Sequence, residues 1–243
     1  MENKMRLSVF VCVLLLFGAF AQEIVPVMHL ELRDEASALN NKGNGKVKPK
    51  FIRPENIEWV EGRSQGRNAI RFKALPDRKA KRVSSCITLP AEGRNAIDFT
   101  KPFTATIWVK PDKTIDANGK YYIFSTFSGD KGSGLAISYG WGRIRAAYGD
   151  GKKELEVTQA GAKIENGTWN HVAVVYDGAK INMYVNGLLC ASKEGNVQPP
   201  SASAWSLGAF LNGYSGQFFG CMEDFCLYDQ PLSAQDILKL AKL

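Results

Sequence analysis

The chain has 243 residues, of which 45% are hydrophobic and 23% charged, so it carries enough apolar side chain to order its backbone, and intrinsic disorder is excluded. No Gly-X-Y repeat and no sustained heptad is present, which excludes the collagen-like and coiled-coil classes. The two histidines, His29 and His171, are too few for a multi-histidine metal centre.

The N-terminus has the features of an export signal. Lys4 and Arg6 precede an apolar run over residues 7–17, and Ala19-Phe20-Ala21 offers a small-x-small cleavage pattern before Gln22. The run is about 11 residues long, shorter than the roughly 20 that a membrane-spanning helix needs. We therefore expect a signal peptide at residues 1–21. The mature domain at 22–243, which has no membrane span, is expected to be secreted or periplasmic.

From residue 103 onward the chain alternates between strand and turn patterns. Residues 103–109 place Phe103, Ala105, Ile107 and Val109 on one face and Thr104, Thr106 and Trp108 on the other. Hairpin turns are predicted at Gly140-Trp141-Gly142 and at Asn186-Gly187. Further strands are predicted at 121–127, 135–139, 144–148, 169–176, 181–185 and 220–228.

Helix is scarce. One short C-terminal helix is predicted to begin at Ser233, whose hydroxyl can cap the first turn, with Asp236 three residues further on. Many short strands separated by turns favour an all-β, two-sheet antiparallel sandwich.

The mature chain has four cysteines, at positions 86, 190, 221 and 226. In an oxidising compartment an even number suggests two disulfides, with three possible connectivities. Their spacing excludes a CxxC redox motif and a zinc ribbon, and free buried thiols are the alternative.

Four segments in this order resemble the sequence blocks of bacterial laminin-G-like domains: 65–72, 103–111, 169–187 and 220–237. The resemblance implies the concanavalin A-like jelly roll, in which two curved antiparallel sheets stack face to face. In that fold an early strand neighbours the last strand, which implies a Cys86–Cys226 disulfide and leaves Cys190–Cys221 as the second pair.

The family resemblance also bears on calcium. Its pattern has an aspartate before a Gly-Asn-Gly loop and a second acid near the last strand. Here Asn40 precedes Gly43-Asn44-Gly45, and Glu223-Asp224 stands in the second place. The missing charge implies at most a weak structural calcium near Asn40 and Glu223, with a solvated loop as the alternative. No other metal or cofactor is expected.

Related glucanases carry three acids in an E-x-D-x-x-E pattern on one strand, and this pattern is absent. Glu223 and Asp224 are adjacent, so a regular strand would point them to opposite faces; Glu154 and Glu156 share a face but lack a third acid. A Ser-His-Asp hydrolase would need His171 or His29 as its base. His171 matches a structural position of the family at a strand start, and no nucleophile motif such as G-x-S-x-G is present. We expect no enzyme activity, although a glycosidase with an unrecognised acid pair is kept as a third hypothesis.

Aromatic side chains in turns are the ligand-binding candidates, because sugars stack on exposed rings. Trp141 lies between two glycines, with Tyr139 two residues away, and Tyr214 follows Asn212 in a polar loop. The alternative is that these residues are partly buried loop anchors. Trp108 and Trp169 match family core positions, although strand parity groups Trp108 with the threonines.

The charge pattern permits anionic partners without requiring them, since the mature chain has a formal charge of +6 once Glu2, Lys4 and Arg6 are removed from the total of +7. A basic run at Arg78, Lys79, Lys81 and Arg82, with Arg67, Arg71 and Lys73 shortly before it, suggests a binding site for sulfated or uronic-acid polysaccharide, with a solvated edge as the alternative. Nucleic acid is not expected.

The leading hypothesis is an exported, non-catalytic module that binds glycan or another surface ligand. The second hypothesis is a structural or adhesion module that contacts a protein partner and has no sugar site.

Overall fold

The computed structural model describes residues 24–75, 77, 81–90, 97–116, 118–127, 132–199 and 205–243. The predicted signal peptide and two members of the basic run, Arg78 and Lys79, lie outside these residues. Within them, no helix is long and apolar enough to cross a membrane.

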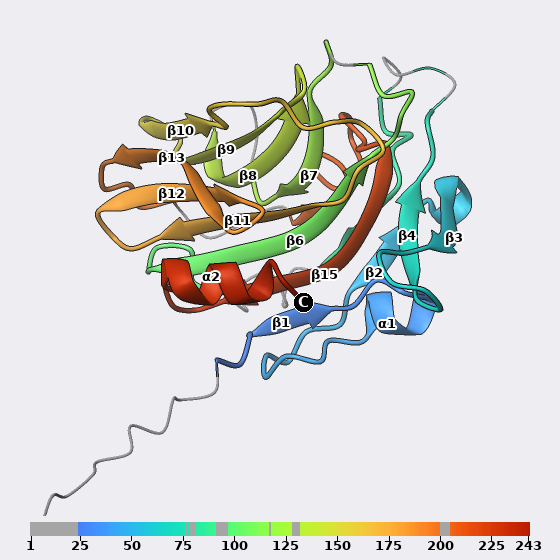
Figure 1. Cartoon of the computed structure of the whole chain (residues 1–243), viewed down its shortest axis with the longest axis horizontal. Helices are drawn as coiled ribbons and strands as arrows, with labels where there is room; N and C mark the ends of the chain where they lie inside the picture. The colour runs from blue at the N-terminus through green and yellow to red at the C-terminus, as the bar shows by residue number, and fades with distance from the viewer. Residues whose placement is uncertain are drawn as a thin grey trace, which may run out of the picture.

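Two antiparallel sheets form the body of the molecule (Figure 1). Sheet A has the strand order β13-β12-β11-β6-β15-β4-β3, with β1 pairing to β15. Sheet B has the order β10-β9-β8-β7-β14-β5-β2. The bounds in sheet A are β1 Met28–Leu30, β3 Ile57–Glu61, β4 Asn68–Phe72, β6 Phe103–Pro111, β11 Asn170–Tyr176, β12 Lys180–Val185, β13 Leu188–Glu194 and β15 Gly220–Tyr228. The bounds in sheet B are β2 Lys50–Ile52, β5 Cys86–Thr88, β7 Tyr121–Ser125, β8 Ser133–Gly140, β9 Arg143–Asp150, β10 Glu154–Thr158 and β14 Ser206–Leu207. The predicted all-β jelly-roll sandwich is confirmed.

The core lies between the two sheets, and the alternation along β6 explains how the sequence builds it. Phe103, Ala105, Ile107 and Val109 are all buried in the main core cluster. Trp108 points the other way and is half-buried on the outer face of sheet A. Strand parity therefore predicts the side chain of Trp108 correctly, whereas the core position implied by the family resemblance is wrong.

Both predicted hairpin turns are present. Trp141 and Gly142 have φ values of 53° and 71°, and Asn186 and Gly187 have values of 51° and 81°. Two successive positive φ angles match the twist of antiparallel strands, which explains why these pairs connect β8 to β9 and β12 to β13.

Helix α2, Ala234–Leu240, begins where the sequence predicts it, with the Ser233 hydroxyl accepting the backbone N–H of Asp236. It packs on the outer face of sheet A, where Ile237 joins a second apolar cluster with Val175 and Tyr184 (Figure 1). A second short helix, α1 at Glu35–Leu39, is an element that the sequence analysis misses. Its five residues are too few to show a helical period, and the Asp34 cap is its main local signal.

All four described cysteines are free, so neither predicted disulfide is present. Cys86 lies on β5 of sheet B, whereas Cys226 lies on β15 and faces the outer side of sheet A. Cys190 on β13 and Cys221 on β15 are separated by four strand spacings, roughly 19 Å at about 4.8 Å each. A disulfide requires Cα atoms within about 7 Å, so this second pair cannot form without rearranging the sheet.

Candidate functional site

The outer face of sheet A, opposite the core, carries the candidate site. Thr104, Thr106, Trp108 and Lys110 follow one another along this face of β6 because side chains on one face recur every second residue. At the Thr104 end the segment leading into α2 closes the face: the Thr104 hydroxyl donates to the Gln230 carbonyl at 2.8 Å. The rest of this face borders two pockets.

The first of these, which we call the arginine pocket, has a volume of about 390 Å³. It is bounded by β1, the loop between β3 and β4, the middle of β6, β11, β15 and the end of α2. Its lining residues are Pro26, His29, Arg33, Arg63, Arg67, Thr106, Trp108, His171, Asp224, Cys226, Tyr228, Leu240 and Leu243. The pocket thus combines several basic groups with aromatic and aliphatic walls.

Arg63 is fixed at the boundary of this pocket. Its guanidinium carbon lies 3.9 Å from the ring centroid of Trp108, in a cation–π arrangement. Its Nε donates to Glu223 at 3.3 Å and its Nη2 to Asp224 at 3.2 Å. Three contacts on one guanidinium leave it little rotational freedom, so it is preorganised.

A bulge in β15 explains how both acids reach the same arginine. Asp224 has a φ of 48°, and the register of β15 against β6 shifts between Glu223 and Cys226. The expectation that Glu223 and Asp224 point to opposite faces is therefore wrong, because the bulge interrupts the strand alternation.

Both histidines of the chain line the arginine pocket, in opposite electrostatic settings. His29 Nε2 lies 3.4 Å from Asp224 Oδ1, and this hydrogen bond raises the pKa of His29 to about 10. Burial, together with the nearby charge of Arg63, lowers the pKa of His171 to about 4. At neutral pH His29 is therefore cationic and His171 is neutral.

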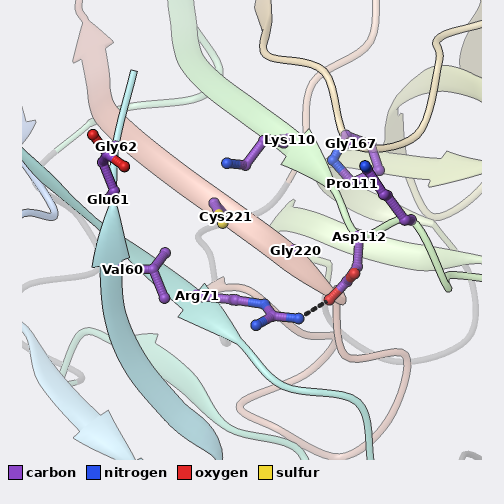
Figure 2. A pocket seen from close by; sticks show the side chains of 11 residues that line it. Val60, Glu61, Gly62, Arg71, Lys110, Pro111, Asp112, Gly167, Gly220 and Cys221 are labelled. Atoms are coloured by element: carbon purple, nitrogen blue, oxygen red, sulfur yellow. Dashed lines mark hydrogen bonds and ion pairs between the residues drawn. The ribbon is translucent and has the colours of Figure 1, made fainter. Parts of the chain in front are cut away.

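The second pocket, which we call the Cys221 pocket, has a volume of about 380 Å³ and lies at the Lys110 end of the face (Figure 2). Arg71 spans its floor, donating to Asp112 at 2.5 Å and to Glu58 at 2.8 Å. Cys221 and Lys110 also line it. Gly62 borders this pocket and Arg63 borders the arginine pocket, so the loop after β3 lies between the two.

The residues at the expected calcium position do not fit the ion. Glu223 and Asp224 are already bound by the Arg63 guanidinium, whose positive charge would repel a cation. Asn40 is exposed at the end of α1, whereas Asn41 organises the loop by accepting from the His29 backbone N–H and donating to the Gly45 carbonyl. No group of three or more His, Cys, Asp or Glu residues that could hold a metal is found among the described residues.

The four ligand candidates predicted from the sequence separate into different environments. Trp141 is 42% exposed on the β8–β9 turn, and the Arg145 guanidinium stacks on its ring at 4.6 Å. The prediction that Tyr139 contacts a ligand is wrong. Its side chain is buried, with 1% exposed, and its hydroxyl donates a hydrogen bond to Asn166.

Tyr214 and Asn212 share one loop. Tyr214 is half-buried, and the charged groups of Lys81 and Arg82 lie 5.5 and 6.0 Å from its ring centroid. The side-chain oxygen of Asn212 accepts a hydrogen bond from Thr88 at 2.9 Å, and its backbone N–H donates to Ser206 at 2.6 Å. Its side chain therefore holds the loop onto the sheet. None of the four residues lines the arginine or the Cys221 pocket.

Sequence reasoning misses Arg33, Arg63 and Arg67 as a group. They lie in loops around the N-terminal strands, where no periodicity relates them. One sequence feature points to this site: Trp108 alternates with Thr104 and Thr106, so its ring is expected on the outer face of β6.

Comparison with known proteins agrees with the fold. Residues 83–238 match the family model of the concanavalin A-like lectin/glucanases superfamily. No curated protein sequence matches the chain.

Among solved structures, the binding domain of Paraclostridial Mosquitocidal Protein 1 is similar with a TM-score of 0.66 and 17% identity, over 89% of this chain and 52% of that one. The botulinum neurotoxin serotype G binding domain has a TM-score of 0.66 and 16% identity, over 89% and 50%. The binding domain of botulinum neurotoxin DC in complex with SialylT has a TM-score of 0.63 and 13% identity, over 90% and 51%. The chain spans about half the length of these structures, and the likeness at this identity concerns the fold.

Proposed function

Because the chain belongs to the concanavalin A-like lectin/glucanases superfamily, we propose that it is a binding module, and more specifically an exported, non-catalytic module for carbohydrate. The similar structures are binding domains, and one of them is described in complex with SialylT, which supports a saccharide ligand by analogy. The apolar run and small-x-small pattern at the N-terminus support export.

The observation that carries this proposal is the pair of adjoining pockets on the outer face of sheet A. Each has a volume near 400 Å³, within the range of small-ligand sites. Trp108 and Leu240 supply apolar surface, and Arg63, Arg67 and His171 supply polar groups. Saccharide recognition needs both kinds of surface.

The carboxylates at this face support a binding role over a hydrolytic one. A glycosidase needs one acid to donate a proton and a second to attack or to activate water. Glu223 and Asp224 are both paired with Arg63, and Glu58 and Asp112 are both paired with Arg71. Glu61, which also lines the Cys221 pocket, is exposed and supplies a single carboxylate, whereas the reaction needs two. Carboxylates held in ion pairs are poor proton donors.

A polysaccharide array tests the proposal, using the mature protein and two variants. We expect the wild type to bind at least one saccharide without hydrolysing it, and His171→Asn to weaken that binding. The surface around Trp141 is a second proposed contact, so Trp141→Ala is compared on the same array. Binding unchanged in both variants would contradict both surfaces, and release of shorter saccharides would contradict the non-catalytic assignment.

The second candidate function is the adhesion module that contacts protein. Leu188 and Leu189, 69% and 56% exposed, begin β13, the edge strand of sheet A, and an exposed apolar edge can pair with another chain. This alternative predicts no saccharide on the array, together with self-association in light scattering that Leu189→Lys abolishes.

A further inference from the structure

The charges in the arginine pocket are unbalanced. Among its lining side chains, those of His29, Arg33, Arg63 and Arg67 are basic, and that of Asp224 is the one acidic side chain. Arg33 also pairs with Glu31 at 2.8 Å, and Arg63 with Glu223, so these two cations are partly compensated. Arg67 is exposed and has no ion pair within the part of the chain that the structure describes. Arg67 is therefore the cation of this pocket whose charge the described acids leave uncompensated.

Two nitrogen atoms of residues that line this pocket have no hydrogen-bond partner within the described part of the chain. His171 Nδ1 is buried without a partner in a residue that is 2% exposed, and Arg33 Nε is likewise unpaired. Buried polar atoms without partners are uncommon in folded proteins, and ligand binding is one recognised role for them. Both residues line the arginine pocket.

The walls restrict the chemistry of that molecule. Trp108, Leu240 and Leu243 provide apolar surface beside the basic groups. A free inorganic anion would leave this surface uncovered, whereas a sugar ring that carries an acidic substituent has both an apolar C–H face and a negative charge.

We infer that the arginine pocket binds an anionic saccharide, with its carboxylate or sulfate group at Arg67 and Arg63 and a ring hydroxyl at His171. This inference rests on the proposed carbohydrate-binding function and specifies its ligand class. Arg63 is held by Trp108, Glu223 and Asp224, so it meets the anion in a fixed geometry. Arg67 supplies the uncompensated charge.

The two histidines provide a site-specific test, since they are the only ones in the chain and both line this pocket. Their ring signals in NMR are followed while the mature protein is titrated with three oligosaccharides of matched backbone: neutral, carboxylated and sulfated. We expect both signals to shift with one or both anionic forms and to stay in place with the neutral form. The carboxylated and sulfated arms identify which group is preferred.

Arg67→Gln is the decisive variant, because the side chain is exposed and its loss should not disturb folding. We expect it to weaken anionic binding roughly 10- to 100-fold, the loss of one charge-assisted hydrogen bond. Lys180→Gln, which removes one exposed charge at the start of β12, is the matched control and should bind like the wild type.

The outcomes separate the inference from the proposed function. Equal binding of neutral and anionic forms, or equal affinity of Arg67→Gln and Lys180→Gln, would overturn the inference and leave carbohydrate binding intact. Absence of any saccharide binding on the array, with no histidine shift, would overturn both.

Discussion

Glu223 accepts the backbone N–H of Arg63 at 2.6 Å while its second oxygen receives the Arg63 side chain at 3.3 Å. Glu223 is 1% exposed, so a buried ion pair attaches the loop after β3 to β15. A Cβ at Gly62 would meet Oε1 of Glu223, so a larger residue there would displace this carboxylate. Glu223, which the sequence analysis considers as a catalytic acid and as a metal ligand, therefore holds Arg63 in place at the arginine pocket.

Replacing Glu223 with alanine should destabilise the fold by about 3–5 kcal/mol, because the buried Arg63 guanidinium keeps only Asp224 as an acidic partner and the Arg63 backbone N–H loses its acceptor. The measurement is the free energy of unfolding in urea. Glu58→Ala, which breaks the half-exposed pair with Arg71, is the control and should cost less than about 1 kcal/mol. An equal loss of unfolding free energy in the two variants would contradict a stabilising role for the buried Glu223–Arg63 pair.

The pKa of His171 predicts weaker stability in acid. An unfolded histidine has a pKa near 6.5, and burial lowers that of folded His171 to about 4. Between these values the unfolded chain binds a proton that the folded chain does not, so stability falls as the pH drops from 6.5 to 4, by at most about 3 kcal/mol. Urea unfolding across this range should show the slope, and His171→Asn should flatten it; an unchanged slope in that variant would assign the effect to other groups.

His29 predicts the opposite dependence on the alkaline side. Its hydrogen bond to Asp224 raises the folded pKa to about 10, so its stabilising contribution is complete below pH 6.5 and is lost as the pH rises towards 10. His29→Gln should remove this loss between pH 7 and 10 and leave the acid-side slope intact. An NMR titration that gives His29 an ordinary pKa would refute the assignment.

Trp141 and Tyr139 should behave differently although they are two residues apart. Trp141→Ala removes an exposed ring and should change the free energy of unfolding by less than about 1 kcal/mol. Tyr139→Phe removes the hydrogen bond to Asn166 and should cost about 1 kcal/mol, with no effect on saccharide binding. Loss of binding in the tyrosine variant alone would place the ligand inside the core and contradict the fold.

The cysteines should titrate as free thiols. Denatured protein, purified without reductant, is expected to react with alkylating agent at all four of them, because no described pair is bonded. Intact mass after alkylation measures this. A mass deficit of two modifications would show that one pair is oxidised, and peptide mapping would then identify which strands have moved.

The strand pattern could be predicted from the sequence because alternation and turn chemistry are local. Residues 103–109 place their apolar side chains inward as the period of two requires, and Asn186-Gly187 turns where both residues accept positive φ. Ser233 caps its helix for the same local reason. The family resemblance added that this sandwich is a jelly roll.

The candidate site depended on contacts between residues distant in the chain. Asp224 departs from strand alternation because of a bulge, and this brings it together with Arg63, 161 positions away. Neither relationship has a local signature, because a bulge and a loop contact are fixed by the packing of β15 against β1, β4 and β6. The sequence by itself therefore determined the two-layer fold, through short-range periodicity. Only the tertiary structure decided that the acids are latched to arginine, that the cysteines are apart, and that basic residues from separate loops line one pocket.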